Sequence, residues 1–269
     1  MDGDTRKFLQ GRNADKVLAK AETPLQNDSS IKRVEIIVLK YKSPDLESEC
    51  ARRIIQYTQH PYKLNIFDNR GNGQNTSKAW NKLIRESTCD YVLLIDSDAF
   101  VFDSVGTING ERQEKSTCWV TEMMRAFTMW PNVAIVGPVC GTTGVTTMQS
   151  MRPKDGAPFE IDGHLSGYCF LTKKSIYEEV GYFDEDFCFY GQESDWIERL
   201  LEERKYRIVI APRAHVVHGM EGMGSMAAQQ AEREGEMDAG QDASYSYLLW
   251  NLKKQRRMKL KGKEFDFKY

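Results

Sequence analysis

The chain has 269 residues, of which 41% are hydrophobic and 28% charged, a composition typical of a folded domain with a sizeable core. Its 37 basic and 39 acidic side chains give a net charge of −2, which excludes a polycation built for nucleic acid. Because no apolar run approaches the ~20 residues that span a bilayer, we expect no integral membrane segment.

The N-terminal segment and the cysteines indicate where the protein works. Residues 1–30 have neither apolar periodicity nor the apolar core of a signal peptide, so we expect a mobile leader and a cytoplasmic protein. The six cysteines are scattered and include no C-x-x-C pair, the spacing typical of zinc or redox centres. We therefore favour reduced thiols over a disulfide framework.

Strands and helices alternate in the next part of the chain. Short apolar and β-branched runs predict strands at residues 34–39, 64–67 and 91–95, and helical spacing of apolar residues predicts helices at 44–60 and 77–86. This alternation is typical of right-handed βαβ units that build a parallel sheet.

The second half of the chain is more mixed. Residues 141–158 are loop-like, and the Gly-, Met-, Gln- and Glu-rich residues 219–242 predict a flexible loop or a weak helix. The remaining predicted elements are a helix at 121–129, strands at 133–136 and 168–172, helices at 174–180 and 194–205, a strand at 207–210 and a helix at 245–260.

An acidic triplet, Asp96-Ser97-Asp98, follows the third predicted strand. Ligands of open α/β sheets bind at the carboxyl ends of parallel strands, so both carboxylates are expected to face that crevice. Oxygen ligands of this kind suit Mg²⁺ or Mn²⁺, which usually bridge to substrate phosphates. The alternative is a pair of turn or capping aspartates without a ligand.

Two further features have both a structural and a chemical interpretation. Glu193 and Asp195 lie at the start of a predicted helix, where carboxylates are common caps, but either is also a candidate general base. His218 follows a predicted strand at the mouth of a loop, where a lone histidine is more often a packed or surface residue than a metal ligand.

The succession of these pieces resembles a family 2 glycosyltransferase with the GT-A fold, over residues 32–220. The pieces that carry the resemblance are Leu39-Lys40-Tyr41, Phe67-Asp68-Asn69, Ala79-Trp80-Asn81, Leu94-Ile95-Asp96-Ser97-Asp98, Leu165-Ser166-Gly167, Gly181 to Phe187, Tyr190 to Asp195, and His218. The resemblance implies an α/β fold with a mixed, mostly parallel central sheet and flanking helices. It divides the chain into a leader at 1–30, a GT-A domain at 31–220, and a lid loop with a basic helix at 221–269.

The resemblance also implies an activity: inverting transfer of a sugar from a UDP-, GDP- or dTDP-sugar to a hydroxyl acceptor, with Mn²⁺ or Mg²⁺ as cofactor. It assigns the metal to Asp96, Asp98 and His218. It assigns donor binding to Lys40, Tyr41, Asp68, Asn69, Asn81, Asp96 and Ser97, and acceptor binding to Ser166, Gly167 and Trp196.

The base assignment rests on a departure from the family pattern. The family usually carries Glu-Asp-x-Asp after the aromatic run, and this chain has Gln192-Glu193-Ser194-Asp195. The resemblance therefore places Glu193 at the position of the base and leaves Asp195 as the second candidate.

The C-terminal segment and the rival functions remain open from sequence. Residues 253–263 include seven Lys or Arg. These cations have three alternative interpretations: a solvated face, a contact with anionic lipid at the membrane periphery, or a site for a polyanionic acceptor such as DNA. The rival functions are a nucleotidyltransferase and a non-catalytic glycan-binding relic of a transferase. A nucleotidyltransferase is expected to have a Gly-rich phosphate loop directly after its first strand, but this chain has Lys40 to Pro44 there.

Overall fold

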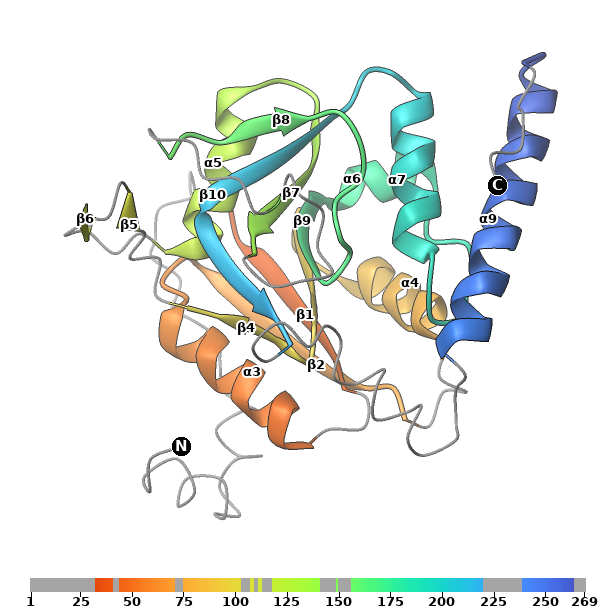
Figure 1. The fold of residues 1–269 in the computed structure, drawn as a ribbon. Helices are drawn as coiled ribbons and strands as arrows, with labels where there is room; N and C mark the ends of the chain where they lie inside the picture. Colours follow the sequence, from red (N-terminus) through yellow and green to blue (C-terminus); the bar gives the residue numbers. More distant parts are fainter. Residues whose placement is uncertain are drawn as a thin grey trace.

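A central eight-stranded sheet with helices on both faces forms the core of the computed structural model of the chain (Figure 1). The structure describes residues 32–40, 44–70, 75–102, 107–108, 111–112, 118–140, 149, 156–219 and 239–263. The sheet strands are β1 (Val34–Lys40), β2 (Tyr62–Asp68), β3 (Tyr91–Asp96), β4 (Ala99–Val101), β7 (Val133–Val139), β8 (Phe159–Ile161), β9 (Cys169–Lys173) and β10 (Arg207–His218). A separate two-stranded pair consists of β5 (Thr107–Ile108) and β6 (Glu111–Arg112).

The strand order is β2-β1-β3-β9-β7-β10-β4, with β8 beside β10. β1 pairs in parallel with both β2 and β3, and β7 pairs in parallel with β10. β9 runs antiparallel between β3 and β7, and β4 and β8 run antiparallel to β10. The predicted fold class, a mixed and mostly parallel sheet with flanking helices, is confirmed.

Two apolar clusters fill the two faces of the sheet because alternate residues of each strand point to opposite sides. On one face, Val34, Ile36 and Val38 of β1 pack with helices α3 (Pro44–Tyr57) and α5 (Trp119–Met129). On the other face, Ile37 and Leu39 pack with α4 (Thr76–Glu86), α6 (Lys174–Val180) and α7 (Gln192–Glu202). Both faces of the sheet are therefore buried, as the continuous apolar strands require.

The main difference from the predicted elements lies in β10, which extends to His218 instead of ending at Ile210. Pro212 cannot donate to a strand ladder, so the apolar pattern breaks there. The strand continues past it with a register shift between Ala211 and His215, and its last residues pair with β4. β4 and β8 were not predicted because each has only three residues, too few for a periodic pattern.

Helix α9 (Ala239–Leu260) lies along the outside of α7 (Figure 1). Four cations of its basic segment form ion pairs with the domain: Lys253 with Asp184 and Asp186, Lys254 with Glu198, Arg257 with Asp195 and Glu202, and Lys261 with Glu202. This use of the basic segment was not foreseen from the sequence, because the acidic partners are some 50 to 70 residues away along the chain.

The basic segment is thus divided between two environments. The remaining cations, Arg256, Lys259 and Lys263, are exposed to solvent. None of the helices in the described parts of the chain is sufficiently long and apolar to cross a bilayer.

Candidate functional site

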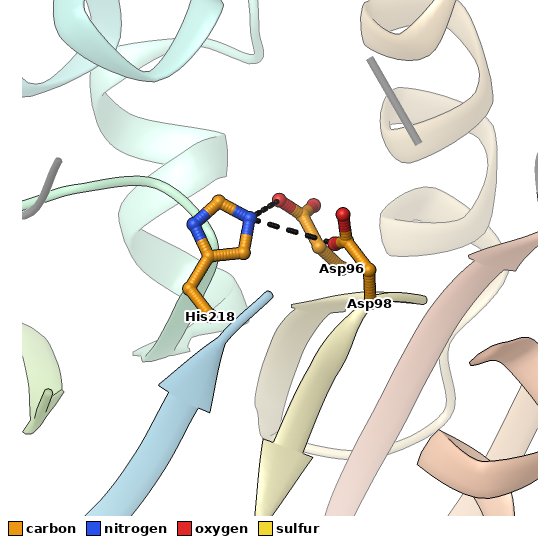
Figure 2. Close-up of side chains that lie close together, drawn as sticks. All are labelled: Asp96, Asp98 and His218. Atoms are coloured by element: carbon orange, nitrogen blue, oxygen red, sulfur yellow. Dashed lines mark ion pairs between the residues drawn. The ribbon is translucent and has the colours of Figure 1, made fainter. Parts of the chain in front are cut away.

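Three polar side chains from the ends of β3, β4 and β10 meet at one edge of the sheet (Figure 2). Nε2 of His218 lies 3.6 Å from Oδ2 of Asp96 and 3.5 Å from Oδ1 of Asp98. One potential ligand atom from each residue lies within 4.8 Å of the other two. This spacing suits a single metal ion bound by two carboxylates and an imidazole.

Strand pairing brings these distant residues together. Asp96 ends β3, and Asp98 immediately precedes β4. Because β4 pairs with the end of β10, His218 lies opposite Ala99, and the amide of Gly219 donates to the carbonyl of Asp98 at 2.9 Å. The three side chains are therefore held by backbone hydrogen bonds and not by flexible loops.

The imidazole of His218 is fixed on its other side by an aromatic ring. It stacks on Tyr168, with ring centroids 4.9 Å apart and planes inclined by 11°. Nε2 is buried and has no hydrogen-bond partner among the described residues. A buried nitrogen that makes no close hydrogen bond and faces two carboxylates is well placed to bind a metal ion.

The electrostatics of the cluster favour a bound cation. Desolvation raises the pKa of Asp96 to about 8, with added repulsion from Asp98 and Glu193, while His218 acts in the opposite direction. Burial opposes the positive charge of His218, but Asp98 and Asp96 outweigh it and raise the pKa of the imidazole. A divalent cation would neutralise this repulsion directly.

Glu193 lies in the first turn of α7, on the same cavity as the cluster. Desolvation raises the pKa of its carboxyl group. Gly167 lies beneath its side chain: a Cβ at position 167 would lie 2.4 Å from Cγ of Glu193 and 2.8 Å from Cδ. The absence of a side chain at Gly167 thus provides the space that Glu193 occupies.

The cavity has a volume of about 210 Å³ and opens at the carboxyl ends of β1, β2 and β3, the edge at which open α/β sheets bind ligands. Nine of the predicted site residues line it: Lys40, Asn69, Asp96, Ser97, Asp98, Ser166, Gly167, Glu193 and His218.

Asp195, the second candidate for the base, lies away from the cavity. Asp195 is only 1% exposed to solvent. Oδ2 accepts a hydrogen bond from Arg199 at 3.0 Å, and Oδ1 accepts one from Arg257 of α9 at 2.7 Å. Because two guanidinium groups hold both oxygens, this carboxylate links α7 to α9 and has no access to a substrate hydroxyl.

Trp196 and Asn81 are also placed in structural positions. The indole of Trp196 is fully buried, stacks on Tyr177 with centroids 4.4 Å apart, and donates to the carbonyl of Gly181. The Asn81 side chain accepts from the amide of Phe183 and donates to its carbonyl, both at 2.9 Å. Neither side chain lines the cavity.

Of the other two predicted donor residues, Asp68 does not line the cavity. The Asp68 carboxylate is exposed and pairs with Arg70, whose hydrogen bonds lower the pKa of Asp68 to about 2. Tyr41 lies outside the described residues.

Helix α4 fixes one wall of the cavity by hydrogen bonds to residues 183–188. Besides Asn81, the Asn75 side chain donates to the carbonyl of Glu185 at 2.9 Å, and the Ser77 hydroxyl donates to the carbonyl of Phe187 at 2.6 Å. These bonds hold residues 183–188, which lead into the aromatic residues Phe189 and Tyr190 on the cavity wall.

The sequence analysis assigned no site role to several residues that line the cavity, among them Thr76, Trp80, Tyr168 and Gln192. Oε1 of Gln192 is buried and has no hydrogen-bond partner among the described residues, so it is available to a ligand. Its only sequence signal was the departure from Glu in the family pattern at this position.

Comparisons with known proteins agree with this geometry. The family model "Glycosyl transferase family 2" matches residues 12–106. This range includes Asp96 and Asp98 and begins within the segment predicted to be a leader. The predicted resemblance to family 2 glycosyltransferases is confirmed. No curated protein matches the chain at the level of sequence.

Two solved structures share the GT-A fold with this chain. GalNAc-T7, solved with UDP, GalNAc and Mn²⁺, superposes with a TM-score of 0.53 at 10% identity, over 83% of this chain and 54% of GalNAc-T7. The mannosyltransferase PcManGT from Pyrobaculum calidifontis, solved with GDP-Man and Mn²⁺, gives 0.54 at 15% identity, over 93% of this chain and 78% of PcManGT. The chain thus spans about half the length of GalNAc-T7.

The position of Asp195 leads to a stability prediction. Asp195→Asn leaves Arg199 and Arg257 without their buried carboxylate, so we expect a loss of about 3 kcal/mol in the free energy of unfolding, measured by urea denaturation. Asp186→Asn is the matched control, because Asp186 also pairs with α9 but its side chain is 71% exposed; we expect it to cost less than about 1 kcal/mol. Equal stability of the two variants would contradict the linking role of Asp195.

Proposed function

We propose that the protein transfers a sugar from a nucleoside-diphosphate donor to a hydroxyl acceptor, with a divalent metal ion and with inversion at the anomeric carbon. One observation carries the proposal: Asp96, Asp98 and His218 converge at the carboxyl edge of the sheet, in a cavity that also holds the Glu193 carboxylate. A metal site and a base on one cavity are what a single-displacement transfer requires.

The residues present fit the proposed metal. Two carboxylates and a buried imidazole nitrogen with no hydrogen bond among the described residues supply one nitrogen and several oxygen ligands. This mixed set favours Mn²⁺ over Mg²⁺, which prefers oxygen ligands alone. When bound, such an ion neutralises charge on a departing nucleoside diphosphate.

The donor is proposed to lie along the ends of β1, β2 and β3. Lys40 at the end of β1 supplies a cation for a diphosphate, and the buried Oδ1 of Asn69 has no hydrogen-bond partner among the described residues. The complexes of GalNAc-T7 with UDP and of PcManGT with GDP-Man, each with Mn²⁺, support a nucleoside-diphosphate ligand for this fold.

Glu193 is the proposed general base. Its carboxylate lines the cavity, and desolvation raises the pKa of its carboxyl group, which increases its affinity for a proton from the acceptor hydroxyl. Attack of that hydroxyl on the anomeric carbon, opposite the departing diphosphate, gives inversion and needs no enzyme nucleophile. Asp195 cannot take this role, because both its oxygens accept hydrogen bonds from arginines.

The two rival functions fit the site less well. A nucleotidyltransferase needs no carboxylate base aimed at an acceptor hydroxyl, whereas Glu193 occupies space that Gly167 leaves open for it. A glycan-binding relic needs no metal site, whereas His218, Asp96 and Asp98 are held together by strand pairing. Contact of the exposed Arg256, Lys259 and Lys263 with an anionic surface remains a secondary proposal.

Metal-dependent binding of the nucleotide tests the site. Calorimetry with UDP and GDP should show binding that requires Mn²⁺, and Asp98→Ala should remove this metal dependence, because Asp98 is the most buried carboxylate of the cluster. Asp90→Ala, which alters an exposed aspartate at the opposite end of β3, is the control and should bind as the unaltered protein does. Undiminished metal-dependent affinity in Asp98→Ala would remove Asp98 from the site.

A second test separates the base from the rest of the site. Glu193→Gln preserves shape but cannot accept a proton, so we expect the transfer rate to fall by ~10²–10⁴-fold while nucleotide affinity is retained. Rates measured on a substrate pair found by screening would decide this. Near-normal transfer by the variant would show that another group takes the proton.

A third test concerns the space beneath Glu193. Gly167→Ala should push the carboxylate from its position and lower the transfer rate by ~10²-fold, because misplacement by about 1 Å has effects of this size. If Gly167 acts only through Glu193, the double variant Gly167→Ala/Glu193→Gln should be no slower than Glu193→Gln alone. Additive losses would instead indicate that Gly167 contacts a substrate directly.

A further inference from the structure

A second groove lies between the loop that precedes α7 and the first half of α9. It has a volume of about 340 Å³, and its lining is His164, Tyr190, Gly191, Ser194, Ser246, Tyr247 and Trp250. We propose that this groove is the acceptor site and that it binds a neutral sugar ring of a saccharide acceptor. The inference rests on the proposed function, since it names the acceptor class for the same reaction.

The position of the groove connects it to the candidate base. Tyr190 lines both this groove and the cavity of the metal cluster. Gly191 and Ser194 line the groove, and Gln192 and Glu193, which lie between them in the chain, line the cavity. A ligand in the groove would therefore extend toward the Glu193 carboxylate, where an acceptor hydroxyl must lie.

The chemistry of the lining matches a sugar. The ring of Tyr247 lies 5.9 Å from that of Trp250, at an interplanar angle of 34°, and the residue is 53% exposed. The C–H face of a pyranose packs on such rings, while Ser194 and His164 offer hydrogen bonds to its hydroxyls.

The charges of the residues in and near the groove favour a neutral ligand. The described lining includes no Lys, Arg, Asp or Glu. The nearby Glu198 carboxylate is compensated by Lys254 at 2.5 Å and makes a hydrogen bond with Nε2 of His164 at 3.2 Å. The groove therefore offers neither the uncompensated cation that a phosphate or carboxylate ligand would need nor an anion for a basic one.

The aromatic wall is held in place by the ion pairs of α9. Lys253 pairs with Asp184 and Asp186, and Arg257 pairs with the buried Asp195, so α9 is anchored within two turns on the C-terminal side of Trp250. At Gly191, with φ of +83°, an added Cβ would lie 3.2 Å from Phe187 and 3.4 Å from Ser246. The glycine thus allows α9 to approach the floor of the groove.

Saccharide binding to the full chain, without donor, tests the inference. Saturation-transfer NMR with a panel of methyl pyranosides and short neutral oligosaccharides should give signals for at least one member. Tyr247→Ala should weaken this binding at least fivefold, because it removes the most exposed ring of the groove. Tyr245→Ala is the matched control: the same change on the same helix, at a residue that is 63% exposed and outside the groove lining. It should bind as the unaltered protein does.

The same samples separate the possible outcomes. Tyr247→Leu keeps an apolar side chain but removes the ring, so it should also lose saccharide binding. This second variant serves as the test if Tyr247→Ala does not fold. Nucleotide binding with Mn²⁺ should be unchanged in all three variants; its absence from the unaltered protein would contradict the proposed function itself. Three outcomes, each with nucleotide binding intact, would overturn the acceptor assignment. They are the absence of any saccharide signal, equal saccharide signals in all variants, and binding only of hexanol or a short aromatic peptide.

Discussion

The repulsion between Asp96 and Asp98 is the constraint on which the site depends. Burial makes it costly to hold two carboxylates together without a positive charge, and the fold places His218 within 3.6 Å of both. This placement requires β10 to continue past Pro212 and pair with β4. The strand pairing and the electrostatics are therefore parts of one arrangement, which a divalent cation would complete.

One wall of the cavity is built by polar contacts between elements distant in the chain. Helix α4 holds residues 183–188 through Asn75, Ser77 and Asn81, and these residues lead into the start of α7 and Glu193. Asp195, two residues further along α7, anchors α9 through Arg257. The same short segment thus orients the candidate base toward the cavity and attaches the aromatic wall of the second groove.

Much of the fold, and the candidate metal site at Asp96 and Asp98, could be predicted from the sequence alone. The continuous apolar strands and the helical spacing between them specify a parallel sheet with both faces covered, because these patterns depend only on local periodicity. The triplet Asp96-Ser97-Asp98 was interpretable because it follows directly after a buried strand, and the carboxyl ends of such strands share one edge. The resemblance to family 2 supplied the proposed roles of His218 and Glu193.

The tertiary structure decided which polar residues face the cavity and which support it. Asn81, Asp195 and Trp196 belong to sequence motifs beside the site, yet their side chains bond to backbone, arginines and aromatic rings. On α7, positions 193 and 195 lie about 200° apart around the axis, so two carboxylates only two residues apart face opposite ways. The acidic partners of the basic segment of α9 likewise lie on α7 and in the residues before it, and no local pattern encodes contacts between residues so far apart in the chain.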